Sequence, residues 1–418
     1  MNTVMILALT IFIITYVLIA VNKTPWFEIK RSYAALLGAV AMLIVGALTI
    51  DQAWDSIDFK VIFLLLGMML MVAGLEFAGF FTIISNLMLR HSEPGPKFLL
   101  SVMLFSAVIS ALALNDAVVL MFTPIVIRCC IKLKVNPIPY LIGLMISANI
   151  GSIATAVGNP QNAYIVGCSG ISFAEFSLYS IPIAIVCLIV SYVILVMIFR
   201  GSLSQRKYVE VDHQDETVVD NRILAVMISI LVMTFVGFML TGVYDIELYQ
   251  VALISGAASS LIVISCQPKK SVWMIRRVDW HILIFFIGLF VLIGGAVQSG
   301  LIDELSQDLH LLDDGGKGDM IPLSVLSVVL SNLVSNVPAV MLIAQMMPPS
   351  DVMAWIVLAA SSTLAGNTTL LGSAANIIVA ERSETYGIRV PFVRHMLVGM
   401  VVTAATLAAM LLCIAVMF

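Results

Sequence analysis

One carboxylate stands at the centre of a long apolar segment. Asp116 lies inside residues 98–131, and no Lys or Arg occurs within eleven residues of it. An acid in that setting is either protonated or neutralised by a bound cation. The chemistry open to it is the loading and release of H+ or Na+, and we predict that Asp116 is a coupling residue. The simpler alternative is a protonated Asp that is hydrogen-bonded to a facing helix.

Four interruptions by polar residues, glycine or proline occur in otherwise apolar sequence. They are Asn115–Asp116, Ser335–Asn336–Val337–Pro338, Gly158–Asn159–Pro160–Gln161–Asn162 and Gly372–Ser373–Ala374–Ala375–Asn376. Glycine and proline release the chain from helical geometry, and amides supply donors and acceptors at the gap. At membrane depth such breaks are tolerated only where they are buried in protein or line a wet cavity. We predict that they form a binding site, whereas any single break alone would be explained by a kink.

The elements that must position these residues are membrane helices. The chain has 418 residues, of which 61% are apolar and 11% charged, with a mean hydropathy of +1.09. This balance excludes a water-soluble domain, and the net charge of −4 leaves no basic face for nucleic acid. Uncharged runs predict ten spans, near 3–21, 32–50, 61–80, 139–167, 179–199, 222–241, 249–266, 281–299, 352–380 and 395–417. Residues 98–131 and 321–346 are predicted to be re-entrant hairpins.

The distribution of positive charge supports this arrangement. With ten crossings and two hairpins, 19 Lys and Arg fall on one side of the membrane and only Lys60 and Lys317 on the other. Cytoplasmic loops collect Lys and Arg, so the chain is predicted to lie in the cytoplasmic (inner) membrane with both termini outside. On the same count, every Lys and Arg is assigned to a loop or to the end of a membrane segment. Glu76, near the cytoplasmic end of its span, is expected to be interfacial and solvated.

The chain contains an internal repeat. The segment from Asp58 aligns with the segment from Asp279 at an offset of 221, which also places Asn115 on Asn336; at an offset of 214, Thr155 falls on Thr369. Five crossings separate the copies, so they are inverted, an arrangement typical of secondary transporters. We therefore predict an all-α polytopic membrane protein. Its parts are a first repeat at 1–200, a cytoplasmic linker at 201–221 and a second repeat at 222–418.

Four segments resemble a known superfamily. They are ALNDAVVLMFTPIVI (113–127), GSIATAVGNPQN (151–162), SNLVSNVPAVML (331–342) and GNTTLLGSAANIIVAE (366–381). They are similar to the ion transporter superfamily of arsenite and antimonite permeases, NhaD-type sodium/proton antiporters and citrate and dicarboxylate carriers. The resemblance implies an elevator-type homodimer with two re-entrant hairpins and two broken helices. It also implies that substrate and coupling ion are held by Asn115, Asp116, Thr155, Gly158, Asn159, Asn162, Ser335, Asn336, Thr369, Gly372 and Asn376.

Two departures from the superfamily patterns bear on the substrate. Many relatives read GDPPN where this chain has GNPQN, and the dicarboxylate carriers have Ser-Asn-Thr at both hairpin tips, whereas the tips here read Leu-Asn-Asp and Ser-Asn-Val. The Asn-Asp tip followed by Thr123–Pro124 is more similar to the arsenite permeases. The expected function is therefore secondary active transport of a small inorganic anion or a metalloid oxyanion such as arsenite or antimonite, coupled to H+ or Na+.

Other functions remain open from the sequence. Within transport, Na+/H+ antiport and Na+-coupled citrate, dicarboxylate or other anion transport would use the same residues, and a passive channel is the alternative from another class. An enzyme is not expected, because no nucleophile with a base and no metal-ligand cluster is found among the six cysteines or elsewhere. No cofactor is expected apart from Na+ as coupling ion. The expected partners are the lipid bilayer and a small inorganic or carboxylate solute, and an ATPase subunit could supply ATP drive.

Overall fold

Helices make up the whole regular structure of the described chain. A computed structural model describes residues 3–20, 29–91, 93–203, 220–268, 271–302, 304, 320–348 and 350–418. The helices of the first half are α1 (Thr3–Ala20), α2 (Arg31–Ile44), α3 (Ile50–Ser56), α4 (Phe59–Phe77), α5 (Phe80–His91), α6 (Pro96–Leu112), α7 (Asn115–Leu133), α8 (Pro137–Ser152), α9 (Pro160–Ser169) and α10 (Phe173–Leu203). Those of the second half are α11 (Asn221–Leu240), α12 (Leu248–Cys266), α13 (Ser271–Arg277), α14 (Trp280–Gln298), α16 (Met320–Val334), α17 (Asn336–Ala344), α18 (Val352–Ala365), α19 (Ala374–Glu384) and α20 (Phe392–Met417).

Seven of the helices in the described residues are long and apolar enough to cross a membrane alone. They are α1, α4, α10, α11, α12, α14 and α20. One of the other three predicted spans corresponds to α2. The remaining two correspond to the pairs α8/α9 and α18/α19, in which a break separates the two helices. The predicted span at 32–50 is wrong in its extent, since α2 ends at Ile44, Gly46 takes a φ of 70°, and Thr49 caps a separate helix α3. At 1.5 Å per residue, the 14 residues of α2 reach only about 21 Å.

The two halves have corresponding helices. Helix α4 runs from Phe59 to Phe77 and α14 from Trp280 to Gln298, so both ends keep the first offset of the sequence repeat. Helices α9 and α19 begin at Pro160 and Ala374, which keeps the second offset. The fold therefore has the inverted repeats with re-entrant hairpins and broken helices that the sequence predicts. The predicted boundaries of the repeats at 200 and 222 stay predictions, because residues 204–219 lie outside the described part.

Matching glycines allow helices of the two halves to pack closely. A Cβ atom at Gly67 of α4 would lie 2.4 Å from the backbone of Ala252 on α12. A Cβ atom at Gly288, the repeat counterpart of Gly67, would lie 2.7 Å from the backbone of Ala35 on α2. Both contacts need the absence of a side chain. Helix α4 of the first half is thus held against the second half, and α14 of the second half against the first.

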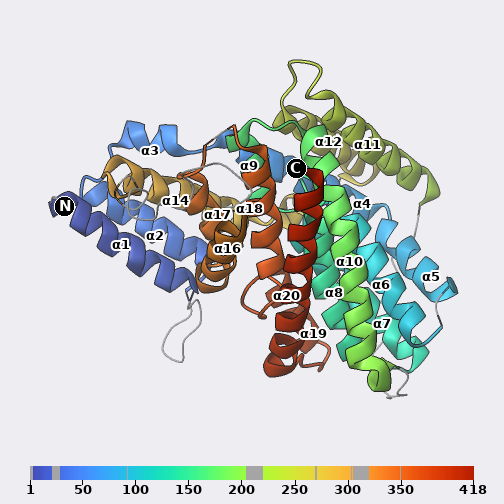
Figure 1. Ribbon diagram of the computed structural model, residues 1–418. Helices are drawn as coiled ribbons and strands as arrows, with labels where there is room; N and C mark the ends of the chain where they lie inside the picture. The colour runs from blue at the N-terminus through green and yellow to red at the C-terminus, as the bar shows by residue number, and fades with distance from the viewer. Residues whose placement is uncertain are drawn as a thin grey trace.

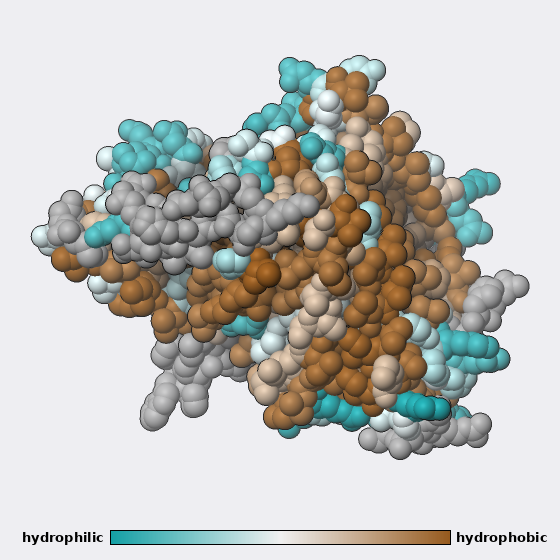
Figure 2. Space-filling view, in the orientation of Figure 1, coloured by the Kyte–Doolittle hydropathy of each residue, from teal (hydrophilic) through white to brown (hydrophobic). Residues whose placement is uncertain are grey.

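The hairpins and broken helices of the two halves pack against one another, α19 against α7 and α17 against α9. Figure 1 shows α1, α2, α3 and α14 as one group at the left, α11 and α12 at the upper right, and α16–α18 between the first group and α8. We call the hairpins and broken helices, α6–α9 and α16–α19, the central bundle. Figure 2 shows a broad apolar surface over α10 and α20, where Ile189 and Met197 on α10 and Val401 and Leu412 on α20 are exposed. This surface suits contact with lipid.

Candidate functional site

The tip of the first hairpin touches the first break directly. Asn115 is the first residue of α7, and its backbone N–H donates to the carbonyl of Gly158 at 2.9 Å. A Cβ atom at Gly158 would lie 2.3 Å from the backbone of Ser152, so the close turn requires glycine. Thr155 Oγ1 donates to the carbonyl of Ala111, just before the tip, at 2.6 Å. Three of the predicted site residues are therefore brought together at this point.

Two asparagines close the first break. Asn159 caps α9, with its Oδ1 accepting from the backbone N–H of Asn162 at 2.8 Å. Asn162 Nδ2 donates to the carbonyls of Ser152 and Thr155 at 3.0 and 3.1 Å. Pro160 occupies the first turn of α9, where a missing N–H costs nothing. The amides thus replace the helical hydrogen bonds that the break removes.

The second break repeats this construction. Asn376 Nδ2 donates to the carbonyls of Gly366 and Thr369 at 2.7 and 3.0 Å, as Asn162 does in the first half. Thr369 Oγ1 accepts from the backbone N–H of Gly372 at 3.0 Å. Ser373, the repeat counterpart of Asn159, precedes α19. Predicted residues of both breaks therefore satisfy backbone groups, and their contact with substrate stays a prediction.

The tip of the second hairpin is a single residue with unusual backbone geometry. Ser335 has a φ of 82°, which side chains other than that of glycine rarely adopt, and Asn336 begins α17 directly after it. With its amide nitrogen turned toward the protein carbonyls, Asn336 donates to Gly372 and Ser362, both at 3.0 Å. The second tip therefore contacts the second break, as the first tip contacts the first.

Asn149 joins the two halves and was not predicted as a site residue. Its side chain is 1% exposed. Its Oδ1 accepts from Asn115 Nδ2 at 3.2 Å and from Ser373 Oγ at 3.0 Å. Its Nδ2 donates to Asn367 Oδ1 at 2.9 Å and to Asn376 Oδ1 at 3.3 Å. One amide thus connects the first tip with both sides of the second break.

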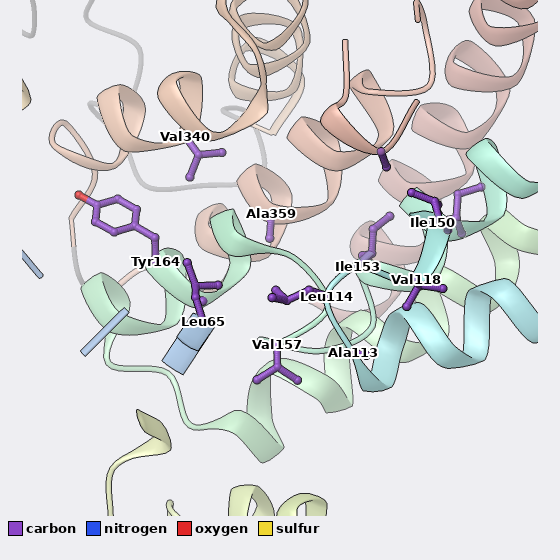
Figure 3. Close-up of a cluster of buried hydrophobic side chains, with 14 of the residues drawn as sticks. Leu65, Ala113, Leu114, Val118, Ile150, Ile153, Val157, Tyr164, Val340 and Ala359 are labelled. Atoms are coloured by element: carbon purple, nitrogen blue, oxygen red, sulfur yellow. The ribbon is translucent and has the colours of Figure 1, made fainter. Parts of the chain in front are cut away.

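A mirrored contact lies on the other side of the repeat. At the offset of 214 Asn149 corresponds to Thr363, and Thr363 Oγ1 accepts from Asn159 Nδ2 at 3.3 Å and from Gln161 Nε2 at 3.2 Å. The offset of 214, extended upstream of the breaks, is the signal in the sequence that relates these two residues. Around these polar contacts apolar side chains of both halves pack together. Figure 3 shows Leu114 and Val157 of the first half near Ala359 of the second.

Several buried polar atoms in this region lack a hydrogen-bond partner. Among the described residues they include three side-chain amide oxygens: Oδ1 of Asn115 at the first tip, Oδ1 of Asn162 at the first break and Oδ1 of Asn332 in the second hairpin. Burying an acceptor without a donor is costly, so native proteins rarely leave one without a purpose. The three oxygens are available to a ligand that brings donors or positive charge.

Asp116 faces a pocket rather than the network of asparagines. It is half-buried and lines a cavity of about 520 Å³ between α4, the first tip and the α13–α14 junction. The charged residues that line this cavity with it are Glu76, Arg276, Arg277 and Asp279. The exposed ring of His281 forms part of the rim, and His281 Nε2 lies 3.0 Å from Lys30 Nζ.

Glu76 differs from the sequence prediction of a solvated, interfacial residue. Its side chain is 17% exposed, and its Oε1 lies 2.6 Å from Arg277 Nη2. The guanidinium of Arg277 also stacks over the ring of Trp273. The acid is therefore fixed in the pocket wall by an ion pair with a helix that the sequence analysis did not predict.

Arg31 also lies elsewhere than predicted. The charge count assigned it to a cytoplasmic loop, but it is the first residue of α2 and extends to the second tip. Its Nη1 lies 3.5 Å from Ser335 Oγ, and its Nη2 lies 3.5 Å from the carbonyl of Leu371 in the second break. A positive charge is therefore present beside the site, where the sequence analysis expected none.

Comparison with known proteins agrees with this architecture. The family model described as "CitMHS: Citrate transporter" matches residues 16–360. The "46 kDa membrane protein" of Mycobacterium leprae is 30% identical, with 96% of each chain covered. The "Silicon efflux transporter LSI3" of Oryza sativa subsp. japonica is 27% identical, with 89% of each chain covered. The crystal structure of the Alcanivorax borkumensis YdaH transporter covers 99% of this chain and 98% of its own, with a TM-score of 0.60 at 14% identity.

The match to the family model extends over most of the chain, and the match to YdaH extends over nearly all of it. The first shows the family, and the second shows the fold. These matches agree with the multi-pass arrangement of apolar helices and with the paired hairpins and breaks. The chain belongs to the citrate transporter family of the ion transporter superfamily, and it is a multi-pass membrane transporter.

Proposed function

We propose that this protein is a secondary active transporter for a small hydroxylated metalloid solute, of the arsenite or antimonite type, coupled to H+ or Na+ through Asp116. The unpartnered amide oxygens carry the proposal. Oδ1 of Asn115, Asn162 and Asn332 can only accept hydrogen bonds. An uncharged metalloid hydroxide brings O–H donors to such atoms. Ionised carboxylate groups are acceptors alone, and citrate has only one hydroxyl donor for the three oxygens.

The charge of the pocket supports the same substrate class. Three carboxylates, Glu76, Asp116 and Asp279, line it together with two guanidinium groups, Arg276 and Arg277, so its formal charge is −1 when every acid is ionised. Because this pocket has no excess of positive charge, it favours a neutral solute over a citrate-like polyanion. The name of the rice relative, a silicon efflux transporter, is consistent with a neutral hydroxide as substrate.

Na+/H+ antiport is a second candidate, favoured by the position of Asp116 in a pocket beside the first tip. Carboxylate and amide oxygens are the ligands that hard cations prefer, and Asp116 would then exchange Na+ for H+. In either case we place the protein in the cytoplasmic membrane with both termini outside and propose that it works as a homodimer.

Transport in everted membrane vesicles tests the proposal. Arsenite uptake is measured with and without an imposed proton-motive force, for the native chain and for Asp116→Asn. Accumulation that requires the gradient and is lost in Asp116→Asn is the expected result, because the variant cannot load or release a proton.

Asp58→Asn is the matched control. Asp58 caps α4 through the N–H groups of Lys60 and Val61, and asparagine caps a helix as well as aspartate does. This variant removes a carboxylate outside the pocket and is expected to accumulate arsenite normally. If the native protein accumulates no arsenite but moves protons when Na+ is added, the second candidate replaces the first. Driven accumulation that survives in Asp116→Asn would show that another residue carries the coupling.

A further inference from the structure

The two hairpins expose matching positions to different degrees. Leu120 on α7 lines the pocket beside Asp116 and is 38% exposed, whereas Met341 on α17, its counterpart at the offset of 221, is 1% exposed. Ala117 at the first tip also lines the pocket and is half-buried, whereas its counterpart Pro338 is buried. Inverted repeats place matching positions on opposite sides of the membrane. The described conformation is therefore open beside the first hairpin and closed beside the second.

Two aromatic rings meet on the closed side, where the open side has a cavity. Met69 of α4 and Ile378 of α19 line the cavity of about 520 Å³. Their counterparts are Phe290 of α14, at the offset of 221, and Tyr164 of α9, at the offset of 214. The rings of Phe290 and Tyr164 are in contact, with centroids 5.8 Å apart, and both side chains are buried. Larger side chains in direct contact thus replace the two residues that the cavity separates.

A hydrogen bond holds the ring of Tyr164 in this position. Gln345, directly after α17, donates from Nε2 to Tyr164 Oη at 2.8 Å. Gln345 is exposed, so the bond lies where the closed side meets the surface. Its counterpart in the first hairpin is Pro124, whose side chain has no donor. The second hairpin therefore positions an aromatic ring in a way that the first hairpin cannot.

The closed side also has contacts between the central bundle and the helices outside it. Tyr164 belongs to the bundle, whereas Phe290 belongs to α14, which packs against α17. On α1, Tyr16 Oη donates to the carbonyl of Pro338 in the second hairpin at 3.2 Å. In the proposed elevator movement the bundle moves against α1 and α14. Both contacts must therefore break before the second hairpin becomes accessible.

We propose that Tyr16, Tyr164 and Phe290 form an outer seal, which closes the solute path on the outer side while the pocket beside Asp116 is open to the cytoplasm. The assignment of sides rests on the proposed orientation, in which the α13–α14 junction at the pocket is cytoplasmic. The seal does not depend on the identity of the solute. Its two contacts with the bundle determine how often the second hairpin opens to the outside.

Side-specific labelling of introduced cysteines tests which hairpin is accessible. Leu120→Cys reports on the open side and Met341→Cys on the closed side, each with a membrane-impermeant maleimide in everted and right-side-out vesicles. Leu120→Cys is expected to react quickly from the cytoplasmic face, and Met341→Cys slowly and from the outer face alone. The native chain, which has six cysteines, gives the background. If Met341→Cys does not fold, Leu342→Cys replaces it, because its counterpart Met121 also lines the pocket.

Conservative substitutions weaken the seal one contact at a time. Tyr16→Phe removes the hydrogen bond to Pro338 and is expected to raise the outer labelling rate of Met341→Cys about fivefold, the equivalent of one ordinary hydrogen bond. Phe290→Met gives the closed side the residue that Met69 supplies on the open side, and it is expected to raise the rate at least about twofold. The rate responds because it follows the population of the state that is open to the outside.

Tyr192→Phe is the matched control for Tyr16→Phe. The hydroxyl of Tyr192 also donates to a proline carbonyl, that of Pro96, at 3.3 Å. This bond joins α10 to the start of α6 in the first hairpin and does not involve the closed side. The outer labelling rate of Met341→Cys is therefore expected to be unchanged in Tyr192→Phe.

The seal and the proposed function fail in different ways. Cytoplasmic labelling of Met341→Cys as fast as that of Leu120→Cys would show that the second hairpin is not closed. An outer rate that stays the same in both Tyr16→Phe and Phe290→Met, or that rises equally in the Tyr192→Phe control, would refute the role of these contacts. None of these measurements uses a solute. A native chain that accumulates no arsenite would therefore refute the proposed function alone.

Discussion

The hydrogen bonds of Asn149 allow a worked prediction for the contact between the two halves. Replacing Asn149 by alanine removes four hydrogen bonds, to Asn115, Ser373, Asn367 and Asn376. Among the described residues, each of the four partner atoms has its hydrogen bond with Asn149 alone, and each partner residue is buried. An orphaned buried polar atom costs about 1–3 kcal/mol, so four give about 4 kcal/mol at the lower limit. That is a large part of the free energy of unfolding of a typical domain, about 5–15 kcal/mol.

The expected result is a large loss of thermal stability. In domains of about 150–250 residues, a loss of 1 kcal/mol in the free energy of unfolding lowers the midpoint by about 2–4 °C. Asn149→Ala should therefore lower the unfolding midpoint by about 8 °C or more. The midpoint can be followed in detergent by the intrinsic fluorescence of the five tryptophans. The variant should also lose transport, since the first tip and the second break are no longer connected.

Ser147→Ala is the matched control on the same helix. Ser147 is buried, but its hydroxyl bonds to the carbonyl of Gly143 in its own helix and to Ser106 on α6, and among the described residues it has no hydrogen bond to the second half. Its replacement should cost about 1 kcal/mol, the value of an ordinary hydrogen bond. Midpoints for Asn149→Ala and Ser147→Ala that agree within about 2 °C would refute the argument that Asn149 holds the halves together.

Two further predictions concern backbone geometry. Gly67→Ala and Gly288→Ala should each abolish a monodisperse, folded preparation, because the new Cβ would lie 2.4 and 2.7 Å from backbone atoms. Gly201→Ala, whose Cβ would have nothing within 4 Å, should be neutral or slightly stabilising. Size-exclusion chromatography compares the three variants, and a normal profile for Gly67→Ala would contradict the packing. Ser335→Gly should raise the unfolding midpoint, because a φ of 82° strains serine by about 1 kcal/mol or more; a lower midpoint would show that its contact with Arg31 outweighs the strain.

The positions of the breaks could be read from the sequence because their causes are local. Gly158 and Pro160 disrupt a helix wherever it is placed, and the structure starts α9 at Pro160. The repeat could be read because both copies keep the same spacing, so that α4 and α14 begin and end at matching positions of the two copies. A run of apolar residues predicts that a membrane span exists, but it does not determine where the helix ends. This is why the predicted span at 32–50 divides at Gly46, where a positive φ stops the helix.

The sequence by itself determined the features that depend on short stretches of chain. These are the membrane class, the repeat, and the hairpin tips and breaks around Asn115 and Asn159. Only the tertiary structure decided which side chains meet. Asn149 lies in an apolar helix of the first half, and its partners Asn367 and Ser373 belong to the second break, far along the chain. In the sequence Arg31 has the position of a loop cation, and only the packing of α2 places it beside the second tip. Such contacts depend on how the inverted halves pack, and no local pattern records that packing.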